Sequence, residues 1–171
     1  YYKIASVNNS EAGSLSSEVN ALTVPAYPDN ISVTGGNTQV SLSWNSVTGA
    51  DSYTIYWDNS SNVTSSSSSI NITGKDNTSF IHTGRDNATT YHYRITAFNS
   101  TGSGSISSVK SALTVPAIPG NLIATGGNTQ VSLSWDNVSG ADNYTIYWDN
   151  SSNVTSSSNP INFTGNDNTS Y

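Results

Sequence analysis

The acceptor pattern for N-linked glycans, Asn-x-Ser/Thr with x not Pro, is the most frequent chemically informative pattern in this sequence. Such an asparagine accepts a glycan only in a chain that is exported past a glycosylation machinery. The pattern occurs fourteen times among 22 asparagines, more often than the Ser and Thr content gives by chance. The acceptor positions are Asn8, Asn30, Asn59, Asn62, Asn71, Asn77, Asn87, Asn99, Asn137, Asn143, Asn150, Asn153, Asn162 and Asn168.

Most of these asparagines lie where a glycan would fit. Asn59 and Asn77, for example, lie in predicted turns, and Asn71 and Asn162 alternate with inward apolar residues and so point outward. We therefore expect covalent N-linked glycans. The alternative is unmodified asparagine that serves turns and caps. The serine run at 65–69 is a weaker candidate for O-linked glycans.

Residues that could perform catalysis or bind a metal are scarce. Cysteine is absent, and His82 and His92, the only histidines, lack metal-ligand spacing, so both are interpreted as ordinary sandwich surface. No nucleophile elbow, phosphate-binding loop or glycosidase carboxylate pair is visible. The oxygen-rich Asp-Asn-Ser-Ser-Asn runs at 58–62 and 149–153 lack calcium-loop spacing. The sequence predicts no enzyme, no cofactor and no metal site.

Two outward tyrosines, Tyr56 and Tyr147, admit two interpretations. They could form an aromatic platform for sugars, or they could be ordinary cross-strand partners on a sheet surface. The second interpretation is favoured.

The charge of the chain argues against two classes of partner. The net charge is −6 with five Lys and Arg in total, which is a poor electrostatic match to nucleic acid or to anionic lipid. No run of 18 apolar residues is present, so no membrane insertion is expected. Charged residues make up only 9% of the chain, and Asn, Ser and Thr supply the polar surface.

The sequence repeats itself with a period of 91 residues. Residues 24–80 recur at 115–171 without a gap, with about three quarters of positions identical, and 115 − 24 gives the period. Residues 1–25 align in the same register with 92–116. A unit of this length is large enough for a small domain of its own, so the repeat predicts separate domains in a row.

Hydrophobic residues alternate with a period of two, which predicts β-strands. The alternation is clear at 40–44, 53–57, 70–72 and 91–97, and turn signals rich in Gly, Asn and Asp separate the runs. Six or seven short strands in about 90 residues, without an amphipathic helix, predict an all-β sandwich.

With these runs in view, the sequence resembles the fibronectin type III domain over its whole length, and most closely the tandem type III repeats of microbial surface proteins. The residues that carry the resemblance are "VSLSW", "GADSYTIYW" and the stretch from Thr78 to Ser108. The resemblance implies tandem immunoglobulin-like sandwiches and says little about activity. Together with the alternation, it implies a structural core of Trp44, Tyr53, Ile55, Trp57, Tyr91, Tyr93, Ile95, Trp135, Tyr144, Ile146 and Trp148.

The same register divides the chain into three parts. Residues 1–23 correspond to strands F and G of an incomplete sandwich, 24–114 to a complete sandwich, and 115–171 to strands A to E of a further incomplete one. We expect 115–171 by itself to leave one face of Trp135, Ile146 and Trp148 uncovered, which forfeits about 1.5–3 kcal/mol for each large side chain.

Two arrangements would supply the strands that the ends lack. The chain is either a segment of a longer array, or each copy donates strands F and G to its neighbour, as in donor-strand complementation. Both give an extended polymer of head-to-tail contacts, with copies of the chain or adjoining repeats as partners. We therefore expect a structural unit of an extracellular or cell-surface fibre, stalk or appendage, coated with glycans. The alternative is an adhesin arm, or a carbohydrate-binding or spacer module of a secreted protein.

Overall fold

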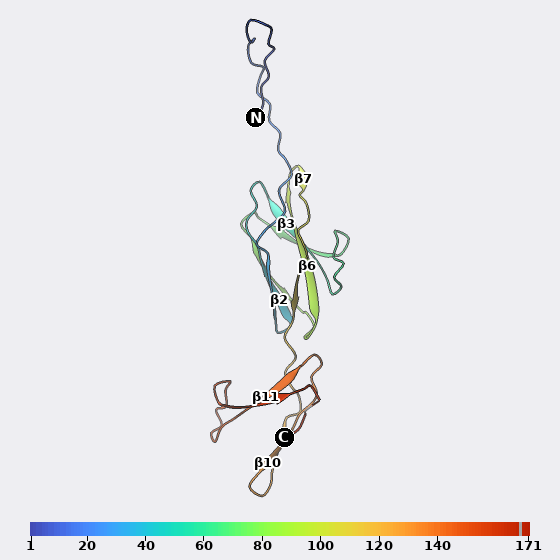
Figure 1. The fold of residues 1–171 in the computed structure, drawn as a ribbon, viewed down its shortest axis with the longest axis vertical. Coiled ribbons are helices and arrows are strands. Elements are labelled where there is room, and N and C mark those ends of the chain that lie inside the picture. Colours follow the sequence, from blue (N-terminus) through green and yellow to red (C-terminus); the bar gives the residue numbers. More distant parts are fainter. Residues whose placement is uncertain (168) are drawn as a thin grey trace.

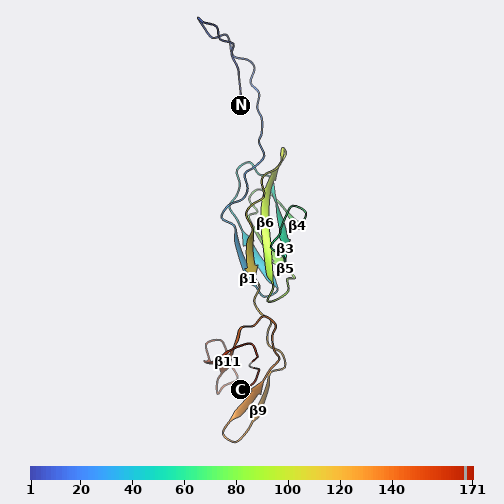
Figure 2. The same cartoon turned by 45° about the vertical axis from the view of Figure 1, so that its right-hand side comes forward.

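The computed structural model describes residues 1–167 and 169–171. Every regular element in these residues is a β-strand, which confirms the predicted all-β class without a helix. Figures 1 and 2 show three parts along one long axis: a thin N-terminal segment, a central sandwich and a C-terminal unit. The described residues contain no helix able to cross a bilayer.

The central sandwich is built from eight strands in two antiparallel sheets. The strands are β1 (Ser32–Gly36), β2 (Gln39–Ser43), β3 (Ser52–Asp58), β4 (Ser68–Thr73), β5 (Ser79–Thr83), β6 (Thr90–Asn99), β7 (Gly102–Ser103) and β8 (Lys110–Leu113). One sheet has the order β1-β2-β5 and the other β4-β3-β6-β7, with β8 paired to β6 beyond β7. Two antiparallel sheets packed face to face confirm the predicted all-β sandwich.

The core lies between the two sheets and follows the predicted alternation. Val40 and Leu42 of β2 face Ile55 of β3 and Ile95 of β6, and all four are buried. Ile55 lies directly opposite Ile95 in the strand register. Trp44 packs edge-on against Tyr53, with ring centroids 5.4 Å apart. Burial of each such side chain contributes about 1.5–3 kcal/mol, which is why the alternating residues fix which sheet face turns inward.

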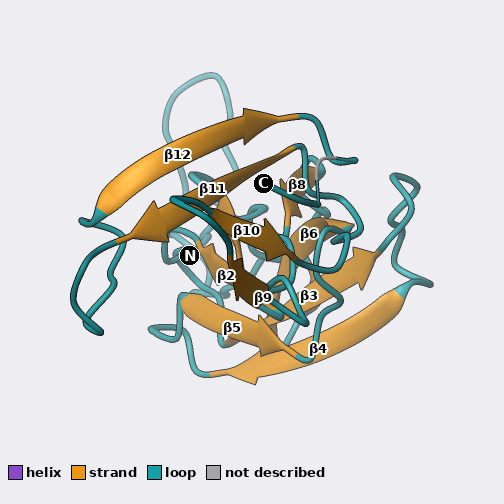
Figure 3. Ribbon diagram, turned by 90° about the horizontal axis from the view of Figure 1, so that it is seen from below, coloured by secondary structure: helices purple, strands orange, loops and turns teal. Residues whose placement is uncertain are grey.

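The C-terminal unit repeats the first half of this architecture. Its strands are β9 (Ile123–Gly126), β10 (Val131–Ser134), β11 (Asn143–Trp148) and β12 (Asn159–Thr164). β9 pairs with β10 and β11 with β12, each pair antiparallel, and Figure 3 shows the two ribbons from below. Ile146 pairs with Ile161 as Ile55 pairs with Ile70, so the repeated sequence adopts the same register twice.

The N-terminal segment, residues 1–23, forms a loose hairpin. Isolated bridges join Tyr2 to Val19 and Val7 to Ala12, and no continuous strand forms. Its apolar side chains, including Ile4, are exposed. A lone hairpin has no sheet face to bury against, so its pairing stays minimal.

Candidate functional sites: glycan acceptors and uncovered sheet faces

Most of the predicted glycan acceptors lie on the surface. Eleven of the fourteen asparagines are exposed: Asn8, Asn30, Asn59, Asn62, Asn71, Asn77, Asn137, Asn143, Asn150, Asn153 and Asn162. Asn87 and Asn99 are half-buried. Asn168 lies outside the described residues.

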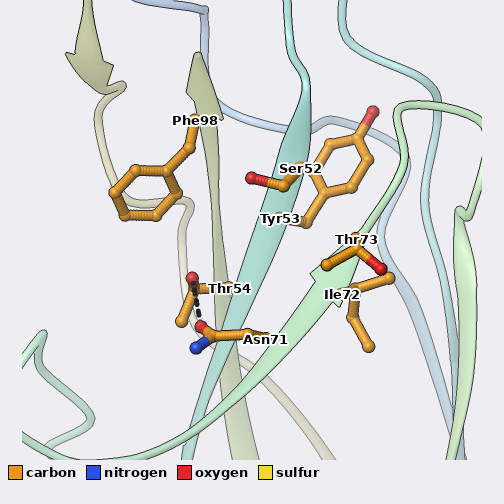
Figure 4. Close-up of a pocket in the computed structure, with 7 residues that line it drawn as sticks. All are labelled: Ser52, Tyr53, Thr54, Asn71, Ile72, Thr73 and Phe98. Carbon is orange, nitrogen blue, oxygen red and sulfur yellow. Dashed lines mark hydrogen bonds between the residues drawn. The ribbon is translucent and has the colours of Figure 1, made fainter. Parts of the chain in front are cut away.

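Asn71, in the middle of β4, is held in an orientation that leaves its amide nitrogen free. The Thr54 hydroxyl of β3 donates a hydrogen bond of 2.9 Å to Asn71 Oδ1. Within the described chain Asn71 Nδ2 has no hydrogen-bond partner, and Nδ2 is the atom to which an N-linked glycan attaches. Figure 4 shows the pair beside a shallow hollow on the outer face of the sheet. The repeat-equivalent pair, Thr145 and Asn162, has the same 2.9 Å bond.

Asn87, in the loop before β6, is used differently. Its Oδ1 accepts a hydrogen bond of 2.8 Å from the Thr38 backbone N–H, and its Nδ2 donates one of 3.0 Å to Asn37 Oδ1. The loop of Asn87 is thereby joined to the β1–β2 turn. An acceptor pattern in the sequence does not distinguish such a bonded amide from a free one, because both bonds come from residues about 50 positions away.

The interpretation of His82 as ordinary surface is wrong. His82 lies in β5 and is 7% exposed. Its Nδ1 shares a hydrogen bond of 3.1 Å with the Tyr93 hydroxyl, and its ring meets Trp57 edge-on at 4.6 Å. Burial, with the nearby Arg85 charge as the smaller cause, lowers the pKa of His82 to about 4.

The side chains around His82 form one packed aromatic cluster. The Arg85 guanidinium lies 4.3 Å from the Trp57 ring centroid and 5.3 Å from that of Tyr91. Burial raises the pKa of Tyr93 well above its ordinary value. His82 is therefore a neutral packing residue at pH 7. The sequence signal that could have located it is its place two residues after Phe80, in phase with an inward side chain.

Groups for metal binding are dispersed. The described residues hold no cluster of three or more His, Asp or Glu side chains able to hold a metal ion. In the 149–153 turn, hydrogen bonds from the Ser151 backbone and hydroxyl lower the pKa of Asp149. The equivalent carboxylate, Asp58, accepts the Ser60 backbone N–H at 2.9 Å. These carboxylates serve their own turns. Tyr56 is half-buried and Tyr147 is exposed on the outer face of their strands.

The structure separates the expected core residues into two groups. Those of the central sandwich lie in or against its core, and Trp135 and Tyr144 are buried in the C-terminal unit. Trp148, by contrast, is 47% exposed, as expected, because within the described part of the chain β11 pairs with β12 alone. The expectation that Trp135 leaves a face uncovered is wrong: it is buried beside Tyr144 and Phe163.

Equivalent positions of the repeat differ sharply in exposure. Val40 is fully buried, whereas its copy Val131 is 57% exposed. Ile95 of β6 is fully buried, whereas its equivalent in the N-terminal segment, Ile4, is 75% exposed. The C-terminal unit therefore presents an apolar sheet face, and residues 1–23 carry the side-chain sequence that covers the equivalent face in the central sandwich.

The sequence was compared with known families and proteins. No protein-family model matches it. The chain is 36% identical over 133 residues to a Kelch domain-containing protein of Saccharolobus solfataricus, covering 72% of this chain and 17% of that protein. It is 34% identical over 117 residues to an amylopullulanase of Thermoanaerobacterium saccharolyticum, covering 66% of this chain and 9% of that enzyme. The chain thus spans less than a fifth of either relative's length.

A solved structure identifies the fold. An fn3 domain of human contactin 1 matches with a TM-score of 0.51 at 21% identity, covering 66% of this chain and 95% of that domain. A sequence identity of 21% supports a shared fold and nothing about function. With the two antiparallel sheets of the central unit and its register, the chain has the fibronectin type III-like sandwich fold.

Proposed function

We propose that this chain is a structural repeat unit of an extracellular fibre, stalk or surface appendage, built head to tail from type III sandwiches and coated with N-linked glycans. The observation that carries the proposal is the pair of apolar surfaces described above, one on the C-terminal unit and one on residues 1–23. They are the two halves of a contact that the central sandwich makes within itself. The partners of this chain in the fibre are copies of the chain or adjoining repeats.

The central sandwich indicates what the head-to-tail contact would look like. There Trp57 of β3 lies opposite Tyr93 of β6, and Ile55 lies opposite Ile95. By the repeat register the same contacts would join Trp148 to a Tyr2-type residue and Ile146 to an Ile4-type residue. A second copy could supply residues 1–23, or a further repeat could supply its own strand F. Such a contact does not close on itself and gives a filament.

The surface also supports an extracellular role. Eleven exposed acceptor asparagines and few charges suit a glycan coat, and bulky solvated groups would suppress pairing between exposed sheet edges. The proposal includes no catalytic role: His82 serves packing, and the carboxylates of Asp58 and Asp149 serve their own turns.

A second candidate function is a spacer or carbohydrate-binding module, or an adhesin arm, of a secreted protein. The match to part of an amylopullulanase favours it. The two candidates differ in particle shape. The fibre requires a long periodic assembly, whereas a spacer or arm occurs in a bounded particle with a defined ligand.

Electron microscopy of native material, combined with intact mass before and after glycan removal, tests the proposal. We expect a density that repeats along one axis and a mass that falls on deglycosylation. Bounded particles without an axial repeat would overturn the fibre, and an unchanged mass would overturn the glycan coat.

A further inference from the structure

The linker that enters the central sandwich is held by the loop after β6. Asn99 Nδ2 donates hydrogen bonds to the carbonyl oxygens of Thr23, at 2.8 Å, and Gly49, at 3.1 Å. The Thr101 hydroxyl donates to the carbonyl of the preceding linker residue, Leu22, at 3.2 Å. In Figure 1 the N-terminal segment reaches the sandwich beside β7. We call residues 99–102 the clamp loop.

The side-chain amide of Asn99 has no unused bonding capacity. An asparagine offers two N–H donors and a carbonyl oxygen with two acceptor positions. Both donors are used by Thr23 and Gly49, and Oδ1 accepts from the backbone N–H groups of Thr101, at 2.9 Å, and Gly102, at 3.3 Å. An N-linked glycan replaces one N–H of Nδ2, so Asn99 cannot hold both carbonyls and also carry a glycan.

The backbone at the end of the clamp loop and just beyond it is packed against the linker as well. A Cβ added at Gly104 would lie 2.2 Å from the carbonyl oxygen of Pro25, and Pro25 is buried. A Cβ at Gly102 would approach Val24 Cγ1 to 3.7 Å. The linker therefore lies in direct contact with the pole of the sandwich rather than hanging free of it.

The next linker shows how the same sequence is held from its other side. Residues 113–115 repeat the Leu-Thr-Val of 22–24. The buried Thr114 hydroxyl donates to the Asp86 carbonyl at 2.7 Å and accepts from the Thr89 backbone N–H at 3.0 Å. The Val115 carbonyl accepts from the Ala88 backbone N–H at 3.1 Å. The threonine hydroxyl is thus held at Thr114 by the sandwich that precedes it, and the threonine carbonyl is held at Thr23 by the sandwich that follows it.

We propose that the pole formed by Gly49 and the clamp loop is a docking site for the extended Leu-Thr-Val-Pro linker, and that Asn99 locks this junction and is not a glycan acceptor. Each linker is then fixed from both sides, which makes the junction between sandwiches stiff. The consequence for a fibre rests on the proposed function, whereas the docking itself does not.

The decisive variant is Asn99→Asp in the full chain. Aspartate keeps the acceptor oxygen for the Thr101 and Gly102 N–H groups and loses both donors. With both hydrogen bonds lost, the population of released linkers should rise roughly 5–30-fold. The matched control is Asn8→Asp, because Asn8 occupies the equivalent repeat position. Its Oδ1 accepts hydrogen bonds from the Ser10 and Glu11 N–H groups in the same way, but its amide does not hold a linker.

Spin-label distances between cysteines introduced at Asn20 and Ser61 measure the release, since the chain has no native cysteine. We expect a narrow distance distribution in the parent and in Asn8→Asp, and a broad one in Asn99→Asp. An unchanged distribution in Asn99→Asp would overturn the clamp. If that variant fails to fold, Thr101→Val, which removes only the bond to Leu22, must broaden the distribution for the proposal to hold.

Glycopeptide mass spectrometry of chain from a glycosylating host tests the second half of the proposal. We expect occupancy at exposed acceptors such as Asn59 and Asn71 and none at Asn99. Substantial occupancy at Asn99 in folded chain would overturn the assignment. If no asparagine is modified, the glycan coat fails while the spin-label result still decides the docking.

Discussion

His82 is a titratable side chain that the fold buries between the two sheets. It lies under Trp57 and beside Tyr93, with the Arg85 guanidinium near the same rings. A proton on its ring would be buried among aromatic carbons near a fixed positive charge, so the neutral form is favoured. The pKa of about 4 expresses this preference.

The lowered pKa of His82 predicts acid sensitivity. In the unfolded chain His82 takes up a proton near its ordinary pKa of 6.5, whereas in the folded chain it takes up a proton only near its lowered pKa of about 4. The unfolded state therefore binds more protons in this window, and the free energy of unfolding falls as the pH drops from about 6.5 to about 4. We expect a loss on the order of 2 kcal/mol, measured by urea unfolding of the central sandwich at pH 7 and pH 4.

Paired histidine variants isolate this contribution from that of the carboxylates. His82→Gln removes the titrating ring and should flatten the pH dependence between 6.5 and 4, at some cost in stability at pH 7. His92→Gln, at a half-buried position on the outer face of β6, should leave the dependence intact. An equal pH dependence in the parent and in His82→Gln would show that other groups cause the acid loss.

Thr38 is a second residue in an unfavourable state, because its backbone conformation is one that threonine rarely adopts. It lies in the β1–β2 turn with φ of 52°, and its repeat copy Thr129 has φ of 59°. The left-handed region costs an L-residue about 1–2 kcal/mol, whereas glycine enters it freely but loses about 0.5–1 kcal/mol of chain entropy. We expect Thr38→Gly to stabilise the central sandwich by up to about 1 kcal/mol in urea unfolding. The same change at Thr34, an extended position of β1, should destabilise it.

At the scale of elements, the repeat places one strand sequence in two environments. β6 pairs with β3 along its edge, and its inward side chains are buried in the core. Residues 1–7, which are its repeat copy, form only isolated bridges. Propensity and alternation are nearly the same in both. The difference in structure therefore comes from the presence or absence of a sheet to pack against.

Truncation of equivalent isoleucines should show this difference. Ile95→Ala opens a cavity in the buried core and should lower the free energy of unfolding by about 2–5 kcal/mol. Ile4→Ala, at its exposed copy, should change it by less than about 0.5 kcal/mol in dilute chain. Denaturant midpoints of the central sandwich check both values, and a comparable loss in the two variants would contradict the assigned burial.

Alternation and turn residues were sufficient to predict β2, β3, β4 and β6 of the central sandwich and which of their side chains face inward. Alternation puts His82 in phase with Phe80, but it could not supply the partners of the ring, because Trp57 and Tyr93 come from the opposite sheet. Nor could they separate free acceptor asparagines from bonded ones. Asn71 and Asn99 have the same local pattern, and the carbonyls of Thr23 and Gly49, 76 and 50 residues away, distinguish the second. The repeat register did predict the exposure of Trp148: it gave this side chain an uncovered face, and Trp148 is 47% exposed.

At the scale of the whole molecule, the uncovered face of the C-terminal unit and the exposed side chains of residues 1–23 are complementary by repeat register. Completion of the C-terminal unit would bury part of Trp148, now 47% exposed, much as Trp57 is half-buried beside β6. Each large side chain that is covered would contribute about 1.5–3 kcal/mol before the cost of ordering the segment. The net gain depends on that ordering cost, which a preformed face reduces on one side of the contact.

The last prediction follows from this complementarity. A synthetic peptide of residues 1–23, added in excess to the full chain labelled with fluorotryptophan, should shift the Trp148 resonance, assigned through Trp148→Phe. The Trp44 resonance should stay in place, because its core is already complete. A peptide with Ile4→Lys should have no effect, since a charge at this position would be buried without a partner. If the Trp148 resonance does not shift when the parent peptide is added, residues 1–23 do not cover this face. The head-to-tail contact would then need the strand F of a further repeat.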